Sequence, residues 1–204
     1  MIAIVDYGVG NLRAFLNVYK RLNIAARTAA NAGELSGATK LILPGVGNFD
    51  DAMERLNASG MRPALETMVR DERVPVLGVC VGMQMLAQSS AEGNLPGLGW
   101  IEGRVTGFAT WKDASGLPLP HMGWNDVRSV SGHGLFKQLE SDARFYFLHS
   151  FFFECARPGD SAAVARYGGD FSCAVSSGNI HGVQFHPEKS HQFGTRLLQN
   201  FAEL

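Results

Sequence analysis

The stretch Val74-Pro75-Val76-Leu77-Gly78-Val79-Cys80-Val81-Gly82-Met83-Gln84 decides the fold class of this 204-residue chain. Its first part, from Val74 to Val79, is apolar throughout and predicts a strand that is buried on both faces. From Val81 to about Ser89 the pattern is helical, so the strand is expected to run directly into a helix. The cysteine at the junction stands in a Gly-x-Cys-x-Gly turn, which is the thiol counterpart of a nucleophile elbow.

Further strands and helices alternate through the first half of the chain. Residues 1–6 and Lys40–Leu43 are predicted strands, and a glycine-containing turn closes each of them. Asn11 is predicted to cap a helix, and two more helices are predicted near 49–57 and 63–71. This alternation predicts an α/β fold of the flavodoxin-like, doubly wound kind, with a mostly parallel sheet and helices on both faces.

Strand-like segments dominate the second half of the chain, and an amphipathic helix ends it. The predicted strands cover 100–108, 118–130, 143–153, 162–167, 171–176 and 180–185. They predict antiparallel additions at one edge of the sheet, within one domain that spans residues 1–204. Ligands of such sheets gather beyond the carboxyl ends of the parallel strands, where both Cys80 and the loop 44–47 are expected.

Composition excludes several classes of protein. Hydrophobic residues make up 46% of the chain, charged residues 18%, and the formal net charge is −1, which disfavours nucleic acid or a membrane as the main partner. The segment MIAIVDYG has no basic region or cleavage site, so it predicts a first strand rather than a signal peptide. Three scattered cysteines are too few for a disulfide framework or a zinc cluster. We therefore expect a cytoplasmic protein with free thiols, no metal and no cofactor.

A thiol nucleophile needs a base, and His186 is the best placed of the six histidines. It closes a predicted strand, and in extended chain Glu188 shares its face, from where the carboxylate can hold one imidazole nitrogen. The other nitrogen is then free for Cys80. Backbone N–H groups at Val81 and in the loop containing Gly47 are candidates to bind an oxyanion. Each residue taken singly has a simpler explanation. Cys80 could be a small buried residue, His186 a histidine at the end of a strand, and the loop with Gly47 an ordinary turn.

The motifs together resemble those of class I (triad) glutamine amidotransferases. The segment GVCVGMQ, followed at a distance by His186-Pro187-Glu188, is similar to the signature of that class. Five ordered segments are similar to the glutaminase subunits of imidazole glycerol phosphate synthases: Asp6–Arg13 (DYGVGNLR), Leu43–Gly47 (LPGVG), Pro120–Asn125 (PHMGWN), Tyr146–Ser150 (YFLHS) and Gly182–Ser190 (GVQFHPEKS).

The resemblance implies a role for each matching residue. Cys80 would attack the side-chain amide of L-glutamine and form a thioester, His186 would move the protons, and Glu188 would orient His186. Gly47 and Val81 match the oxyanion positions, and Gln84 matches a residue that contacts glutamine. The segment that binds glutamine largely through its backbone would be His149, Ser150 and Phe151. The family usually has tyrosine at position 151, so a hydroxyl role there is lost.

The resemblance also implies a partner. Ammonia would pass to a separate (β/α)8-barrel cyclase subunit, in a heterodimer that serves histidine biosynthesis. The chain length agrees, because 204 residues leave no room for a domain that accepts ammonia. The loop 44–47, with its two glycines, is a hypothetical switch for partner-dependent activation. Four residues in matching motifs are candidate partner contacts: Asn11, Trp124, Tyr146 and Lys189.

Three other functions fit parts of the sequence. Gly8-Val9-Gly10 after a strand is typical of dinucleotide-binding oxidoreductases, but Arg13 replaces the third glycine of that fingerprint. A partner-independent cysteine hydrolase on the same fold would not need Gln84 or the 121–125 segment. An amidotransferase paralogue that feeds a different synthase also agrees with the sequence. A metal site at His181, His186 and His191 is disfavoured because Pro187 interrupts the helix that such spacing needs.

Overall fold

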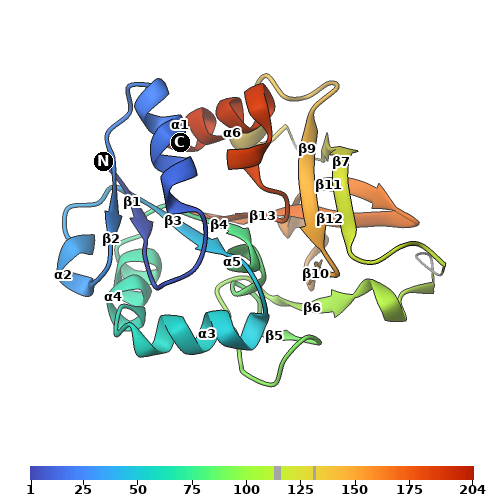
Figure 1. Ribbon diagram of the computed structural model, residues 1–204, viewed down its shortest axis with the longest axis horizontal. Helices are drawn as coiled ribbons and strands as arrows, with labels where there is room; N and C mark the ends of the chain where they lie inside the picture. Colours follow the sequence, from blue (N-terminus) through green and yellow to red (C-terminus); the bar gives the residue numbers. More distant parts are fainter. Residues whose placement is uncertain (113–115, 131) are drawn as a thin grey trace.

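A mixed β-sheet runs through the centre of the molecule in the computed structural model, which describes residues 1–112, 116–130 and 132–204 (Figure 1). Five neighbouring strands are parallel, in the order β2 (Ala26–Ala29), β1 (Ile2–Val5), β3 (Lys40–Gly45), β4 (Val76–Cys80) and β13 (Ile180–Val183). Every residue of β1, β4 and β13 is buried, as expected of parallel strands that are covered on both faces.

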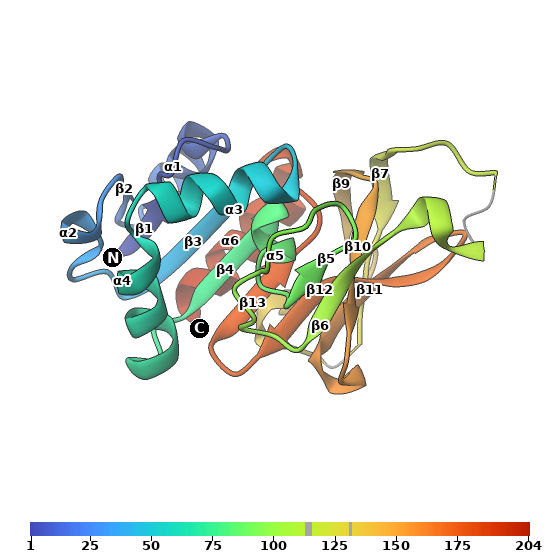
Figure 2. The same cartoon turned by 90° about the horizontal axis from the view of Figure 1, so that it is seen from below.

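Antiparallel strands extend this sheet beyond β13. They are β12 (Gly169–Ser177), β10 (Phe151–Cys155) and β6 (Gly103–Gly107), with β11 (Ser161–Tyr167) paired to β12 and β8 (Arg128–Ser129) paired to β11. The short β5 (Ser89–Ser90) pairs with β6 in parallel. A separate antiparallel ribbon consists of β7 (His121–Asp126) and β9 (Arg144–His149). Figure 2 shows this strand-rich part beside the parallel strands, in agreement with the predicted antiparallel additions.

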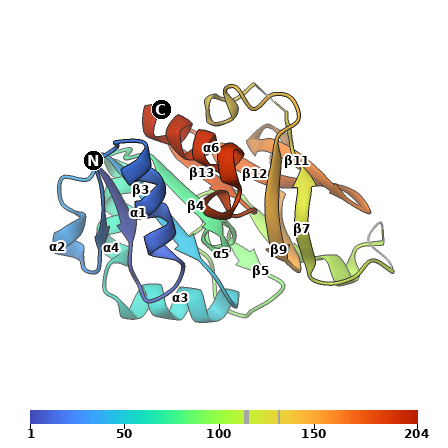
Figure 3. The ribbon, with the colours of Figure 1, turned by 45° about the horizontal axis from the view of Figure 1, so that its top comes forward.

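Helices cover both faces of the parallel strands. On one face α1 (Leu12–Arg21) packs beside α6 (His191–Glu203), as Figure 3 shows. The other face carries α3 (Phe49–Ala58), α4 (Arg62–Glu66), the π-helical turn η1 (Thr67–Asp71) and α5 (Val81–Gln84), while α2 (Ala32–Leu35) follows the edge strand β2. Short 3-10 turns are η2 (Phe108–Thr110), η4 (Gly134–Phe136), η5 (Pro158–Asp160) and η6 (Pro187–Lys189). This is the predicted doubly wound α/β architecture.

Several predicted boundaries follow from local chemistry. Asn11 caps α1 by accepting a hydrogen bond from the backbone N–H of Ala14 at 3.3 Å. Asn48 caps α3 in the same way, by accepting the N–H of Asp50 at 2.9 Å. Within the described residues, no helix combines the length and apolar character that crossing a bilayer requires.

Four predicted elements differ from the structure. The segment 118–130 is not one strand, because β7 ends at Asp126 and β8, which belongs to the other sheet, begins at Arg128. The helix expected from Val81 to about Ser89 ends at Gln84, after which the chain turns and enters β5. The segment 143–153 is not one strand, because it breaks at Ser150 between β9 and β10, which belong to different sheets. Residues after Phe185 are not extended as expected, since Pro187 begins the turn η6. Strand β2 and helix α2 were not predicted, and β2 is a half-buried edge strand without an apolar run.

Candidate active site

Cys80 sits at a strained junction between β4 and α5. Its backbone angles are φ 56° and ψ −115°, an uncommon conformation for a residue other than glycine. The flanking glycines are required by close backbone contacts. A Cβ on Gly82 would lie 1.9 Å from the carbonyl oxygen of Leu43, and one on Gly78 would lie 2.6 Å from the carbonyl oxygen of Gly82. The sequence therefore forms a tight elbow that holds the thiol at the carboxyl edge of the sheet.

His186 and Glu188 lie next to this thiol and form a hydrogen bond with each other. The distance from Nδ1 of His186 to Oε1 of Glu188 is 2.9 Å, and both side chains are almost fully buried. Burial of the ring disfavours its charged form, but hydrogen bonds and charges from Cys80 and Glu188 outweigh it and raise the pKa of His186 to about 9. The ring is therefore positively charged at neutral pH, facing the sulfur on one side and the carboxylate on the other.

A second set of contacts fixes the backbone of His186. Its N–H donates to the carbonyl oxygen of Tyr146 at 2.9 Å. The Ser190 hydroxyl accepts the N–H of Tyr146 at 3.0 Å and donates to the carbonyl oxygen of His186 at 2.6 Å. Ser190 was not singled out from the sequence, although it belongs to a matching motif. These bonds tie the His186 turn to β9.

A cavity of about 340 Å³ opens at Cys80. It brings together the residues that the sequence predicted as nucleophile, as base, as oxyanion-binding groups and as substrate contacts. Glu188 does not line it, because this side chain lies behind His186. The lining residues are Val46, Gly47, Cys80, Val81, Gln84, Glu92, Pro120, Leu148, His149, Ser150, Phe151, His186 and Lys189. The volume fits a small-molecule substrate of amino-acid size.

Gln84 and the unpredicted Gln184 form a buried amide pair beside the sulfur. Nε2 of Gln84 donates to Oε1 of Gln184 at 3.1 Å and to the carbonyl oxygen of Phe151 at 3.3 Å. Nε2 of Gln184 lies 3.8 Å from Sγ of Cys80. Oε1 of Gln84 is buried and has no partner among the described residues, while Gln84 itself is one of the residues that line the cavity. A polar residue between the apolar Val183 and Phe185, just before His186, is the signal that could have identified Gln184.

Glu92 is the second lining residue that the sequence analysis did not identify. Its Oε2 accepts the N–H of Phe49 at 2.9 Å, which ties its loop to the start of α3. Burial raises the pKa of this carboxyl group, partly offset by that hydrogen bond. No local pattern signals Glu92, because its place in the site depends on a contact between segments far apart in the chain.

The loop after β3 contacts the elbow directly. Gly45 pairs with Cys80 in the sheet, and a Cβ on Gly45 would lie 2.2 Å from the backbone nitrogen of Gly82. The hydroxyl of Tyr7 donates to the carbonyl oxygen of Pro44 and anchors the start of the loop. Gly47 has a φ of 88°, a conformation that favours glycine. The loop thus places Gly47 against the cavity next to Val81.

Of the four candidate partner contacts, Lys189 lines the cavity, and Tyr146 and Trp124 lie beside Lys189. Trp124 and Tyr146 are paired across β7 and β9, and Nζ of Lys189 lies 5.9 Å from the centre of the Tyr146 ring. The Trp124 ring stacks on His191 with 5.3 Å between centroids. Asn11 differs, because its side chain caps α1, and that helix packs against η6. Among the described residues, no group of three or more His, Cys, Asp or Glu is arranged to hold a metal.

Comparison with known proteins gives a consistent family. The family "Glutamine amidotransferase class-I" matches residues 4–204. A protein of Bdellovibrio bacteriovorus, imidazole glycerol phosphate synthase subunit HisH, is 64% identical over 204 residues, which is the whole of both chains. A protein of the same description from Leptospira interrogans is 52% identical over 204 residues, again the whole of both chains.

Solved structures agree on the fold. One described as a glutamine amidotransferase superposes with a TM-score of 0.76 at 22% identity and covers 99% of this chain and 97% of its own. Another glutamine amidotransferase, from Thermotoga maritima, gives a TM-score of 0.64 at 16% identity and covers 99% of this chain and 82% of its own.

Proposed function

This chain belongs to the class I glutamine amidotransferases, among the HisH subunits of imidazole glycerol phosphate synthase, and from that premise we propose how its own residues hydrolyse glutamine. The sequence-based interpretation of family and enzyme class is thereby confirmed. The observation that carries the mechanism is the set of contacts at Cys80: a strained elbow, an imidazole ring held by Glu188, and a cavity of substrate size. The family match over 4–204 also supports a single domain over 1–204.

The first half of the reaction forms a thioester. The sulfur of Cys80 attacks the side-chain amide carbon of L-glutamine, a C–S bond forms, and the amide oxygen becomes an oxyanion. Backbone N–H groups at Val81 and Gly47 stabilise that oxyanion. His186 carries the thiol proton to the leaving nitrogen, the C–N bond breaks, and ammonia departs. Glu188 keeps the ring in the orientation that both transfers need.

The second half hydrolyses the thioester. Water attacks the same carbon while His186 takes one of its protons. The C–S bond then breaks, the proton returns to the sulfur of Cys80, and glutamate leaves. The net reaction converts glutamine and water into glutamate and ammonia and leaves the protein unchanged.

Substrate recognition uses the rest of the cavity lining. Gln84 lines the cavity and would contact glutamine, with its amide group oriented by the hydrogen bonds of its Nε2 to Gln184 and Phe151. The carboxylate of Glu92 matches the α-ammonium group of an amino acid in charge. Segment 149–151 also lines the cavity and would bind glutamine largely through its backbone groups.

The ammonia is handed to a synthase partner. We propose a heterodimer with a (β/α)8-barrel cyclase subunit in the cytoplasm, with Trp124, Tyr146, Lys189 and Asn11 as contact residues. The names of the relatives that match over the full chain, at 64% and 52% identity, support this partner over a different synthase. Asn11 is the weakest member of that set, because its side chain is already used to cap α1.

The decisive experiment replaces the nucleophile. Cys80→Ala in the complex with the cyclase subunit is expected to abolish glutamine-driven synthesis and to leave ammonia-driven synthesis intact, because only the glutaminase half uses the thiol. Cys173→Ala is the matched control, since Cys173 is also a buried free cysteine. Loss of both activities in Cys80→Ala, or loss of neither, would contradict the assigned role.

A further inference from the structure

Two buried histidines outside the triad, His121 and His149, face each other across β7 and β9. Nδ1 of His121 lies 2.9 Å from Nε2 of His149. On the other side of this pair, Nδ1 of His149 lies 2.7 Å from the carbonyl oxygen of Phe151. At the far end, Nε2 of His121 lies 3.2 Å from Nδ2 of Asn125. The four groups form one continuous hydrogen-bonded relay.

Both rings are neutral at physiological pH. Burial lowers the pKa of His121 to about 4 and that of His149 to about 3. A neutral imidazole has one donor nitrogen and one acceptor nitrogen. Each ring in the relay can therefore donate only one hydrogen bond and accept only one.

The chemistry of the relay fixes its direction. A carbonyl oxygen only accepts, so His149 must donate from Nδ1 to Phe151 and accept at Nε2. His121 must then donate from Nδ1 and accept at Nε2, where the amide group of Asn125 donates. Asn125 is held in turn, because the same Nδ2 donates to the carbonyl oxygen of Arg166 at 2.9 Å. The hydrogen bonds of the relay therefore run in one direction, from Asn125 through His121 and His149 to Phe151.

The relay ends on a group that belongs to the substrate site. The carbonyl oxygen of Phe151 accepts from both His149 and Gln84, and all three of these residues line the cavity. His121 is itself clamped between two rings, with centroid distances of 4.2 Å to Tyr167 and 4.9 Å to Phe147. A shift of His121 would therefore release His149 and, through it, the wall of the cavity.

We infer that His121 and Asn125 are positioning residues, which hold the 149–151 segment in the arrangement that binds glutamine. This inference rests on the proposed glutaminase function. Neither residue lines the cavity, so they act only through His149 and Phe151. The competing explanation is that His121 is merely packed in an aromatic cluster. The two explanations differ in which property of His121 matters, the ring or its Nδ1 donor.

The experiment compares His121→Phe with His121→Asn. Phenylalanine keeps the ring and removes the donor, while asparagine loses the ring and keeps an N–H close to the position of Nδ1. We expect His121→Phe to raise the KM for glutamine ~10-fold, with a smaller effect on kcat and none on ammonia-driven synthesis, because one buried hydrogen bond is lost. His121→Asn is expected to restore the KM to within ~3-fold of the wild type.

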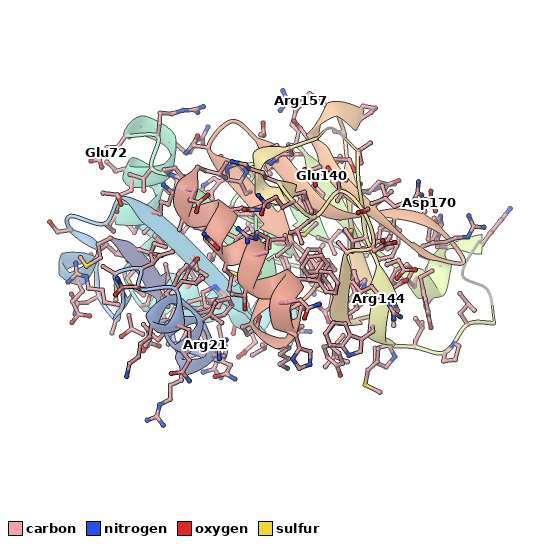
Figure 4. The ribbon with its side chains drawn as sticks, turned by 90° about the horizontal axis from the view of Figure 1, so that it is seen from above. Arg21, Glu72, Glu140, Arg144, Arg157 and Asp170 are labelled. Atoms are coloured by element: carbon pink, nitrogen blue, oxygen red, sulfur yellow. The ribbon has the colours of Figure 1, made fainter. Side chains whose placement is uncertain are left out.

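Arg144→Ala is the matched control. Arg144 forms an exposed ion pair with Asp126 at 2.9 Å, at the other end of the same β7–β9 ribbon (Figure 4). Its loss should leave the KM unchanged. A KM as high in Arg144→Ala as in His121→Phe would overturn the inference. Any loosening of the β7–β9 ribbon would then be enough to raise the KM for glutamine.

The remaining outcomes are also decisive. An unchanged KM in a folded His121→Phe protein, or an equal rise in both His121 variants, refutes the positioning role. If His121→Phe fails to fold, Asn125→Ala replaces it, with an expected KM rise of ~3-fold, and an unchanged KM again refutes the role. Absence of glutamine hydrolysis by the wild-type complex would instead refute the proposed function.

Discussion

The charge on His186 depends on two neighbouring side chains. The ring is buried, which on its own favours the neutral form, yet Cys80 and Glu188 raise its pKa to about 9. In the unfolded chain the same group titrates near its ordinary value of about 6.5. The folded state therefore binds this proton more tightly than the unfolded state, and stability is linked to pH at this residue.

The sign of this linkage gives a prediction for Glu188→Gln. Below about pH 6.5 the protonated ring contributes its full stabilisation, which is lost as the pH rises through about 9. Removing the carboxylate lowers the folded-state pKa, so the Tm difference between wild type and variant should be largest near pH 6 and shrink toward pH 10. Thermal unfolding across that range measures it. Glu154→Gln, which breaks an exposed pair with Arg104, should give a pH-independent difference. Parallel curves for wild type and Glu188→Gln would contradict this assignment.

At the scale of the element, apolar runs in the sequence predicted the parallel strands β1, β3 and β4, because strands buried on both faces need apolar residues throughout. The features that the sequence did not predict depend on contacts between segments that are far apart in the chain. Helix α5 stops at Gln84 where the chain must turn to reach β5, and Glu92 enters the site only through its bond to Phe49. The elbow and the His186–Glu188 pair were predictable because their chemistry is local.

The contact between β3 and the start of α5 should be intolerant of any side chain. A Cβ on Gly82 would lie 1.9 Å from the carbonyl oxygen of Leu43, which is backbone in the middle of a buried sheet. Gly82→Ala is therefore expected to destabilise the fold by about 3 kcal/mol, or roughly 10 °C in Tm for a chain of this size. Gly159→Ala is the control, since a Cβ there meets nothing within 4 Å. Equal melting temperatures for the two variants would show that β3 and α5 can separate.

At the scale of the whole molecule, the cavity opens on a face with exposed apolar side chains. Met122 is 65% exposed and Trp124 is 40% exposed, both on β7. Met122 pairs with Leu148, which lines the cavity, so this apolar surface is continuous with the mouth of the site. Side chains of this kind around a site that releases ammonia are typical of a partner interface. A protein docked there would shield ammonia from solvent.

A charged side chain on that face should weaken binding of the partner without lowering the stability of the fold. Met122→Glu is expected to weaken association with the cyclase subunit by ~10-fold or more, because an unpaired carboxylate would be buried at the interface. Its Tm should stay within about 2 °C of the wild type, since the side chain is exposed. Val130→Glu is the matched control, as Val130 is 58% exposed and is hydrogen-bonded through its backbone to Ala162 of β11 instead of belonging to the β7–β9 ribbon. Calorimetric titration of each variant with the cyclase subunit measures the effect. Equal affinities for Met122→Glu, Val130→Glu and the wild type would place the partner on a different face and would remove Trp124 and Tyr146 from the proposed contact set.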